Sequence, residues 1–212
     1  MEYFSVNEIR KLEEEAMRKG MTVDKMMDNA GKLSAEFITK NITFTKVVFI
    51  AGTGNNGGDA ISTAFHLFNI KQNDSRIFIL GKEDELNDGS RAFLDVINDI
   101  KTMRVDFIDD TSKLNSLSAD VKDADLIVVG IFGTGFHGSL PEIPSKVVDI
   151  VNESNAKKIS LDIPSGINCD TGEFEKTVKS DFTFSMLCRK KAFQNQKVME
   201  MCGHIEVFDI LG

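Results

Sequence analysis

The fold is decided by one stretch near the first quarter of the chain, Val47-Val48-Phe49-Ile50-Ala51-Gly52-Thr53-Gly54-Asn55-Asn56-Gly57-Gly58-Asp59. Its first five residues are a continuous apolar run, which is typical of a short strand buried on both faces. Four glycines follow at positions 52–58, and they allow the backbone to turn sharply and to approach a ligand closely. The stretch therefore predicts a buried strand at 47–51 that leads into a ligand-binding loop.

The same alternation of apolar run and helical segment continues toward the C-terminus. Further strands are predicted at 76–80, 105–108, 126–132, 158–163, 182–186 and 205–208. Helices are predicted between them at 60–68, 89–100 and 143–151. Buried strands that alternate with amphipathic helices indicate a parallel sheet covered on both faces. We predict an α/β fold, a three-layer α/β/α Rossmann-like domain with a mostly parallel, doubly wound sheet.

Two helices are expected before the first strand. Ser5 and Glu8 have the spacing of a capping box, in which each side chain accepts a backbone N–H of the other. Gly20 ends this helix, and Thr22 can cap a second one, in which apolar residues recur with a period near 3.6. No internal repeat or linker interrupts the sequence, so we interpret residues 1–212 as a single domain.

Composition excludes several classes of protein. Hydrophobic residues make up 42% and charged residues 27% of the chain, which is ordinary for a globular protein. The net charge of -8, without a Lys/Arg cluster, argues against nucleic-acid and anionic-membrane partners. No apolar stretch of membrane-spanning length and no signal-peptide pattern is found. Three cysteines without C-x-x-C spacing suit free thiols in a reducing compartment, so we expect a cytoplasmic location.

Three loops are expected to meet at the carboxyl edge of the sheet, where open parallel sheets bind ligands. The first is the glycine-rich loop at 52–59. The second, at 133–139, combines three glycines with two hydroxyls and suits an anion bound by backbone N–H groups. The third follows the strand at 158–163 and contains Asp162 and Ser165. A carboxylate at the end of a buried strand is costly unless it has a use, although tight turns and an Asp that caps its own turn remain alternatives.

Other chemistries fit the sequence less well. His66 and His204 lack a metal-ligand partner at useful spacing, which argues against zinc. Ile163 occupies the position of the first glycine of a G-x-S-x-G elbow, which disfavours a serine hydrolase. His137 is a candidate acid–base group or a solvated loop histidine. A Rossmann dehydrogenase needs an acidic residue about 20 residues after its glycines; Asp74 is near enough, but no hydride-transfer constellation follows.

Taken together, these motifs resemble the YjeF N-terminal domain family. Residues 52–60 are similar to the family's GPGNNGGDG, and residues 162–166 read DIPSG as the family does. Residues 129–135 are similar to D-A-[IL]-[FL]-G-[TF]-G, and residues 26–31 to LMENAG. The NNGGD and DIPSG motifs, in this order and about 100 residues apart, are specific, and the resemblance covers essentially the whole chain.

Family members with known activity are NAD(P)HX epimerases. The resemblance implies an isomerase that interconverts the R and S forms of NADHX and NADPHX, the hydrates of NADH and NADPH, at C6 of the nicotinamide ring. This is a repair reaction for nicotinamide nucleotides that needs no organic cofactor. The resemblance also implies a homodimer and coupling to a nucleotide-dependent NAD(P)HX dehydratase, fused or separate. The alternative is a catalytically impaired ligand-binding or dimerising scaffold module of the same family.

The resemblance assigns roles to residues by motif position. Asp162 would contact the nicotinamide end and act as the catalytic proton carrier. Asn56 and Ser165 would bind a potassium ion, for which amide and hydroxyl oxygens are suitable hard ligands. The residues that would bind the substrate are Asn55, Asn56, Gly57, Gly58, Asp59, Gly133, Thr134, Gly135, Phe136, His137, Gly138, Ser139 and Asp162.

Several positions depart from the family pattern. Val129 stands where the family has an aspartate that also binds potassium, so we expect this ion to bind weakly or not at all. Thr53 replaces a proline and Ala60 a glycine, which are mild changes. The segment 183–190 corresponds to TFGAPK; its last residue, Lys190, is kept, but the proline is lost. These departures favour the impaired module, whereas the intact NNGGD and DIPSG motifs favour the enzyme.

Overall fold

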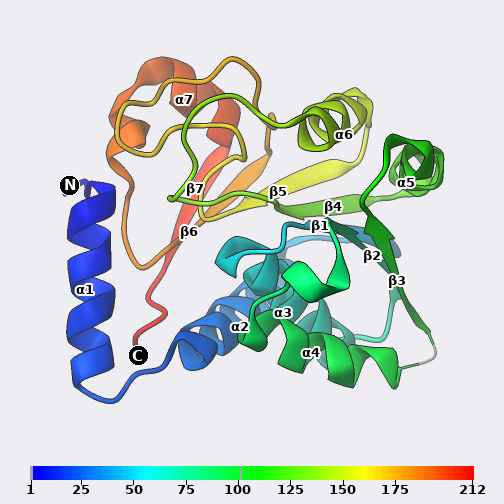
Figure 1. The fold of residues 1–212 in the computed structure, drawn as a ribbon, viewed down its shortest axis with the longest axis horizontal. Helices are drawn as coiled ribbons and strands as arrows, with labels where there is room; N and C mark the ends of the chain where they lie inside the picture. The colour runs from blue at the N-terminus through cyan, green and yellow to red at the C-terminus, as the bar shows by residue number, and fades with distance from the viewer. Residues whose placement is uncertain (1, 101) are drawn as a thin grey trace.

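A computed structural model describes residues 2–100 and 102–212 (Figure 1). Its centre is a seven-stranded sheet of order β3-β2-β1-β4-β5-β6-β7, in which every neighbouring pair is parallel. The strands are β1 (Lys46–Ala51), β2 (Asp74–Leu80), β3 (Met103–Ile108), β4 (Leu126–Gly130), β5 (Lys157–Leu161), β6 (Phe182–Met186) and β7 (His204–Phe208). The chain first builds the sheet outward from β1 to β3 and then from β4 to β7, so the order reverses between β1 and β4.

Helices cover both faces of the sheet. The α-helices are α1 (Val6–Arg18), α2 (Val23–Asn41), α3 (Asn55–Ile70), α4 (Asp88–Asn98), α5 (Leu114–Asp123), α6 (Glu142–Glu153) and α7 (Gln196–Cys202). The 3-10 helices are η1 (Glu83–Glu85), η2 (Thr111–Lys113) and η3 (Lys191–Gln194). Helices α2, α3 and α4 lie on one face, and α5 and α6 lie on the other (Figure 1). Helix α1 stands beside the body of the molecule, next to the end of the sheet that carries β6 and β7 (Figure 1).

The apolar run of β1 explains why it forms the middle of the sheet. Val47 and Phe49 point into the apolar cluster formed with α2, α3 and α4, whereas Val48 and Ile50 point into the cluster formed with α5 and α6. Successive side chains of a strand point to opposite faces. A strand covered on both sides therefore has to be apolar at every position, and this makes it visible in the sequence.

The predicted three-layer α/β/α fold with a doubly wound sheet is confirmed, and the sheet is parallel throughout the described strands. The capping box is present, since the Glu8 carboxylate accepts the Ser5 N–H at 2.8 Å. Thr22 caps α2 by accepting the Lys25 N–H at 3.1 Å. None of the helices in the described part of the chain combines the length and the apolar character needed to cross a bilayer.

Some predicted boundaries are wrong. The helix predicted from position 60 begins at Asn55, because Gly54 serves as its N-cap, so half of the glycine-rich stretch is helical. The strands predicted to 132 and 163 end at Gly130 and Leu161. Helices α5 and α7 were not predicted. The first buries only three residues, and the second has only seven residues, so neither leaves a long periodic pattern in the sequence.

Candidate active site

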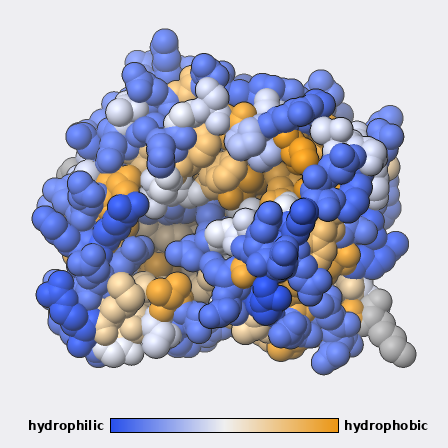
Figure 2. All heavy atoms as spheres, viewed as in Figure 1, coloured by the Kyte–Doolittle hydropathy of each residue, from blue (hydrophilic) through white to orange (hydrophobic). Residues whose placement is uncertain are grey.

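A cavity of about 710 Å³ opens at the carboxyl ends of β1, β4, β5 and β6, and one side of it is formed by α1. Figure 2 shows this face hollowed beside α1, with apolar residues recessed below a largely hydrophilic rim. The cavity lies where the strand order reverses, the usual ligand position in doubly wound sheets. The predicted residues that line it are Asn55, Asn56, Asp59, Gly133, Thr134, Gly135, Phe136, His137, Ser139 and Asp162. The predicted residues that do not line it are Gly57, Gly58, Gly138 and Ser165.

Two buried glycines pack the first loop against the rest of the site. A Cβ atom on Gly57 would lie 1.8 Å from the carbonyl oxygen of Gly52, and one on Gly52 would lie 2.2 Å from the carbonyl oxygen of Ile131. At both glycines, therefore, one backbone segment is in direct contact with another. The start of α3 is thereby held against the ends of β1 and β4. Its N-cap, Gly54, has no side chain to accept the N–H groups of the first turn, and such free donors suit an anion.

The close approach at Gly57 predicts a large effect for a small substitution. Gly57→Ala is expected to lower the free energy of unfolding by about 2–4 kcal/mol, because neither backbone segment can move aside without shifting α3 against β1. Gly54→Ala is the matched control, since a Cβ atom there meets nothing within 4 Å. Urea denaturation of both variants measures the difference. Equal stability of the two variants would contradict the packing described.

Asp162 directly follows β5 and has a strained backbone. Its φ is +66°, in the left-handed region. The Ile163 N–H donates to the Leu161 carbonyl oxygen at 2.8 Å, so Asp162 is the central residue of a three-residue turn. This form of γ-turn is rare and strained. The Asp162 N–H donates to the Phe184 carbonyl oxygen of β6 at 2.7 Å, which fixes the turn to the sheet. Strain of this kind persists only where the surroundings enforce it.

The neighbouring strand β6 ends in the same way. Leu187 has a φ of +68°, and the Cys188 N–H donates to the Met186 carbonyl oxygen at 2.8 Å. The Leu187 N–H donates to the Phe208 carbonyl oxygen of β7 at 2.7 Å. Two strained turns therefore lie at adjacent strand ends. The second turn leads the chain toward Lys190, which contacts the first.

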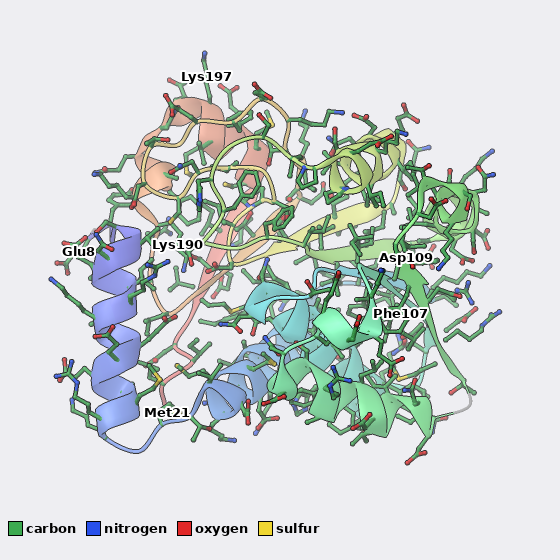
Figure 3. All side chains as sticks on the ribbon, viewed as in Figure 1. Glu8, Met21, Phe107, Asp109, Lys190 and Lys197 are labelled. Atoms are coloured by element: carbon green, nitrogen blue, oxygen red, sulfur yellow. The ribbon has the colours of Figure 1, made fainter. Side chains whose placement is uncertain are left out.

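Lys190 forms a buried ion pair with Asp162. Its side chain is 1% exposed, and its Nζ lies 2.7 Å from Asp162 Oδ1 and donates to the Met186 carbonyl oxygen at 2.6 Å. The other carboxylate oxygen of Asp162 accepts the Thr134 N–H at 2.9 Å. Burial lowers the pKa of Lys190, but the charge of Asp162, its hydrogen bond to the ammonium group and the nearby thiols of Cys188 and Cys169 together raise it. The pair therefore consists of a cation and a carboxylate. Lys190 lies between α1 and the sheet (Figure 3).

The N-terminal segment holds the backbone on both sides of Lys190. The Phe4 N–H donates to the Arg189 carbonyl oxygen at 2.9 Å, and the Lys191 N–H donates to the Phe4 carbonyl oxygen at 2.8 Å. The Val6 N–H donates to Asp170 Oδ1 at 2.8 Å. The first residues of the chain thus position the lysine that pairs with Asp162.

Asn56 faces the space beside this ion pair. Its side-chain oxygen and nitrogen are buried and have no hydrogen-bond partner among the described residues. A Cβ atom on Gly133 would lie 3.3 Å from Asn56 Cγ and 2.7 Å from Asp162 Oδ2, so Gly133 leaves open the space between the two side chains. A buried amide without a partner is unusual. Together with the open space, this arrangement indicates that a bound ligand completes the hydrogen bonds of Asn56.

Two of the positions expected to bind potassium lie on opposite faces of the sheet. Val129 is fully buried in the apolar cluster of α5 and α6, whereas Asn56 belongs to α3 on the other side of the sheet. Ser165 Oγ is 1% exposed and is occupied by the Phe132 backbone, whose N–H and carbonyl oxygen both lie 3.1 Å from it. Of the three positions, Val129 offers no oxygen, whereas the Asn56 amide and the second lone pair of Ser165 Oγ remain available.

The second loop adds an aromatic wall. The rings of Phe132 and Phe136 are stacked, with centroids 5.0 Å apart and an interplanar angle of 30°, and both line the cavity. His137 is exposed, and its Nδ1 lies 3.0 Å from the Gly135 carbonyl oxygen. The Ser139 hydroxyl is at the exposed rim and donates to Glu175 at 3.0 Å. The wall suits a planar ring, whereas His137 has no carboxylate partner among residues 2–100 and 102–212 that would prepare it for proton transfer.

Sequence analysis missed the contribution of α1 and gave no role to Lys190. Ile9, Glu13 and Met17 line the cavity together with Arg10. The spacing of four residues could have predicted that Glu13 faces the site, because it places Glu13 on the same helix face as the buried Ile9. The burial of Lys190 was harder to predict, since a lysine after an apolar strand is normally exposed.

Comparison with known proteins gives consistent matches. The family model "YjeF-related protein N-terminus" matches residues 23–192. The bifunctional NAD(P)H-hydrate repair enzyme Nnr of Archaeoglobus fulgidus is 34% identical over 211 residues, covering 99% of this chain and 42% of that protein. The NAD(P)H-hydrate epimerase of Rhodopirellula baltica is 31% identical over 186 residues, covering 87% of this chain and 74% of that protein. The chain therefore spans less than half of the bifunctional relative.

Two further matches extend the comparison. The NAD(P)H-hydrate epimerase of Elusimicrobium minutum is 29% identical over 223 residues, covering 99% of this chain and 96% of that protein. The crystal structure of yeast ynu0, YNL200c, superposes with a TM-score of 0.81 at 21% identity, covering 93% of this chain and 86% of that chain. The structural match shows a common fold.

Proposed function

Because the chain belongs to the YjeF-related protein N-terminus family, we propose that it interconverts the R and S hydrates of NADH and NADPH at C6 of the nicotinamide ring. Relatives that cover most of the chain are NAD(P)H-hydrate epimerases or bifunctional NAD(P)H-hydrate repair enzymes. The observation that carries the proposal is the Asp162–Lys190 ion pair at the base of a cavity large enough for a nucleotide.

The cavity offers a separate place for each part of the substrate. The free N–H groups at the start of α3 and the backbone of the loop at 133–139 suit the phosphates. The stacked rings of Phe132 and Phe136 suit a planar base or the nicotinamide ring. Asp162 is then the proton carrier at the nicotinamide end, and the unpaired amide of Asn56 completes its hydrogen bonds with the substrate.

The reaction requires proton transfer together with the loss and return of water at C6. At C6 the hydroxyl group accepts a proton and leaves as water, while the lone pair of the ring nitrogen N1 forms a C6=N1 double bond. Water then adds to the other face of C6 and releases a proton, which restores the hydrate with inverted configuration. A carboxyl group positioned at C6 can supply and accept these protons. The chemistry therefore needs no organic cofactor. The S hydrate would pass to a nucleotide-dependent dehydratase, fused or separate.

The direct test is incubation with purified R-NADHX, followed by chromatographic measurement of the S epimer. The spontaneous rate, measured without protein, has to be subtracted. A protein-dependent rate that scales with protein concentration supports the proposal. Absence of any rate above the spontaneous one, from folded protein, refutes it.

A second candidate is a ligand-binding or dimerising module of the same family without activity. The replacement of the family aspartate by Val129 and the lost proline before Lys190 favour it. Titration calorimetry with the substrate hydrate and the epimerisation assay together separate the two candidates, because the module binds the hydrate without epimerising it. Light scattering measures the proposed homodimer in the same preparation.

Potassium is expected to have little influence on the rate. Val129 offers no oxygen, so the formal charge of the family site is missing and the remaining ligands are neutral oxygens. Loss of an opposite charge at a partly buried site weakens ion binding by roughly 1–4 kcal/mol, or about tenfold for every 1.4 kcal/mol. The measurement replaces choline chloride by potassium chloride at constant ionic strength. A steep, saturable potassium requirement would show this expectation to be wrong.

A further inference from the structure

The cavity contains more carboxyl groups than cations to balance them. Asp59, Asp162 and Glu13 line it, and the basic residues that line it are Arg10 and Lys190. Lys190 is committed, because its ammonium group is held by Asp162 and by a backbone carbonyl oxygen. Arg10 is exposed on α1. The Asp59 side chain has no hydrogen bond or ion pair with any residue in the described ranges. Asp59 is therefore a half-buried carboxyl group without a counter-ion.

The protonation of Asp59 follows from this arrangement. Burial raises its pKa well above the ordinary value, and the charges of Asp162 and Glu13 raise it further, while Lys190 only partly offsets them. Burial and the charge of Asp162 also raise the pKa of Glu13, which faces the site from α1. The remaining titratable group that lines the cavity is the exposed His137. The raised pKa favours the protonated form of Asp59, whereas the Lys190 ammonium group pairs with the carboxylate of Asp162.

We propose that Asp59 is a second catalytic residue of the proposed epimerase and exchanges protons with C6 from a different side than Asp162. The two groups enter the cavity from different elements, since Asp59 comes from the second turn of α3 and Asp162 from the end of β5. Two carboxyl groups in environments that separate their protonation states form the arrangement that acid–base enzymes use. The inference rests on the proposed function, because it assigns a role within that reaction.

The two residues divide the reaction between them. The Asp59 carboxyl donates its proton to the C6 hydroxyl, the C6–O bond breaks with both electrons leaving on water, and the N1 lone pair forms the C6=N1 bond. Water adds to C6 from the opposite side and gives its proton to the Asp162 carboxylate. Asp59 is then ionised and Asp162 protonated, and exchange with solvent water restores both. The reverse epimerisation uses the same groups with their roles exchanged.

The test compares Asp59→Asn with Asp95→Asn, a control that removes an exposed carboxylate of α4. Asp59→Asn is expected to lower kcat by about 10²-fold or more, with KM changed only a few-fold. Asp95→Asn is expected to retain the wild-type kcat. Circular dichroism before each assay shows that both variants are folded. The Asn substitution removes a half-buried acid without a partner, so it leaves no other group without its counter-charge.

The pH profile gives a readout that a structural role would not change. Asp59 must carry its proton, so the wild-type rate falls as the pH rises through the raised pKa of this group. This alkaline limb should be absent from the residual activity of Asp59→Asn. Suppose that the wild type is active and that Asp59→Asn either has a kcat within about threefold of the wild type or shows the same alkaline fall in rate. Either result overturns the inference and leaves the proposed function standing. An inactive wild type overturns the proposed function itself.

Discussion

Asp162→Asn is expected to lower the rate of epimerisation by about 10²- to 10⁴-fold, because the amide keeps the shape of the side chain but cannot accept the proton. Positive φ is tolerated by asparagine as well as by aspartate, so the strained turn after β5 can be kept. The rate is measured from R-NADHX to the S epimer, with the spontaneous rate subtracted. A variant that epimerises at nearly the wild-type rate would remove Asp162 from the mechanism.

The structure adds a condition to this experiment. From the motif alone, the substitution is expected to leave the fold intact. The ion pair shows that it also leaves the Lys190 ammonium group buried without its counter-charge. The rates therefore have to be compared at a temperature at which circular dichroism shows the variant to be folded. Asp95→Asn again serves as the control for an isosteric change at the surface.

Lys190→Met is expected to lower the free energy of unfolding by about 3–5 kcal/mol, the usual effect of removing one partner of a buried pair. The double variant Lys190→Met, Asp162→Asn is expected to recover most of this loss, because no uncompensated charge remains. Urea denaturation of the wild type, both single variants and the double variant measures the coupling. Losses that simply add in the double variant would show that the two side chains do not interact.

The pH dependence of the same pair has a defined sign. The pKa of Lys190 is raised above its ordinary value of 10.5. The stabilisation that comes from its charge is therefore fully present below that value and is lost as the pH rises through the raised pKa. In Lys190→Met this alkaline loss of stability should be reduced.

Most of the fold could be predicted from the sequence because burial leaves a strong pattern. In β1 and β6 each position is constrained by the sheet, and the predicted strands match the observed ones within one residue. The start of α3 could not be placed, because glycines usually interrupt a helix. Here the helix contains Gly57 because only a glycine fits against the Gly52 carbonyl oxygen. The local preference was overridden by tertiary packing.

The candidate site, like the fold, could be predicted only in part. That three separate loops share one cavity follows from the position of strand ends in a parallel sheet, and the structure brings Asn56, Gly133 and Asp162 together. The position of Lys190 could not be predicted, because it depends on the positive φ of Leu187, a conformation that leucine rarely adopts. It also depends on hydrogen bonds from Phe4, at the other end of the sequence.

The contact between Phe4 and the segment around Lys190 has a consequence for synthesis on the ribosome. Parallel strands β1 to β5 can begin to pair while the chain is still growing, but Lys190 emerges only after β6. The backbone of Phe4, which emerges long before, has no hydrogen-bond partner until then. We therefore expect the cavity to be completed only after β6 has emerged. A nascent chain arrested before residue 163, which also lacks Asp170, should remain protease-sensitive at the segment around Phe4. Resistance at that segment in such an arrested chain would show that another contact holds it earlier.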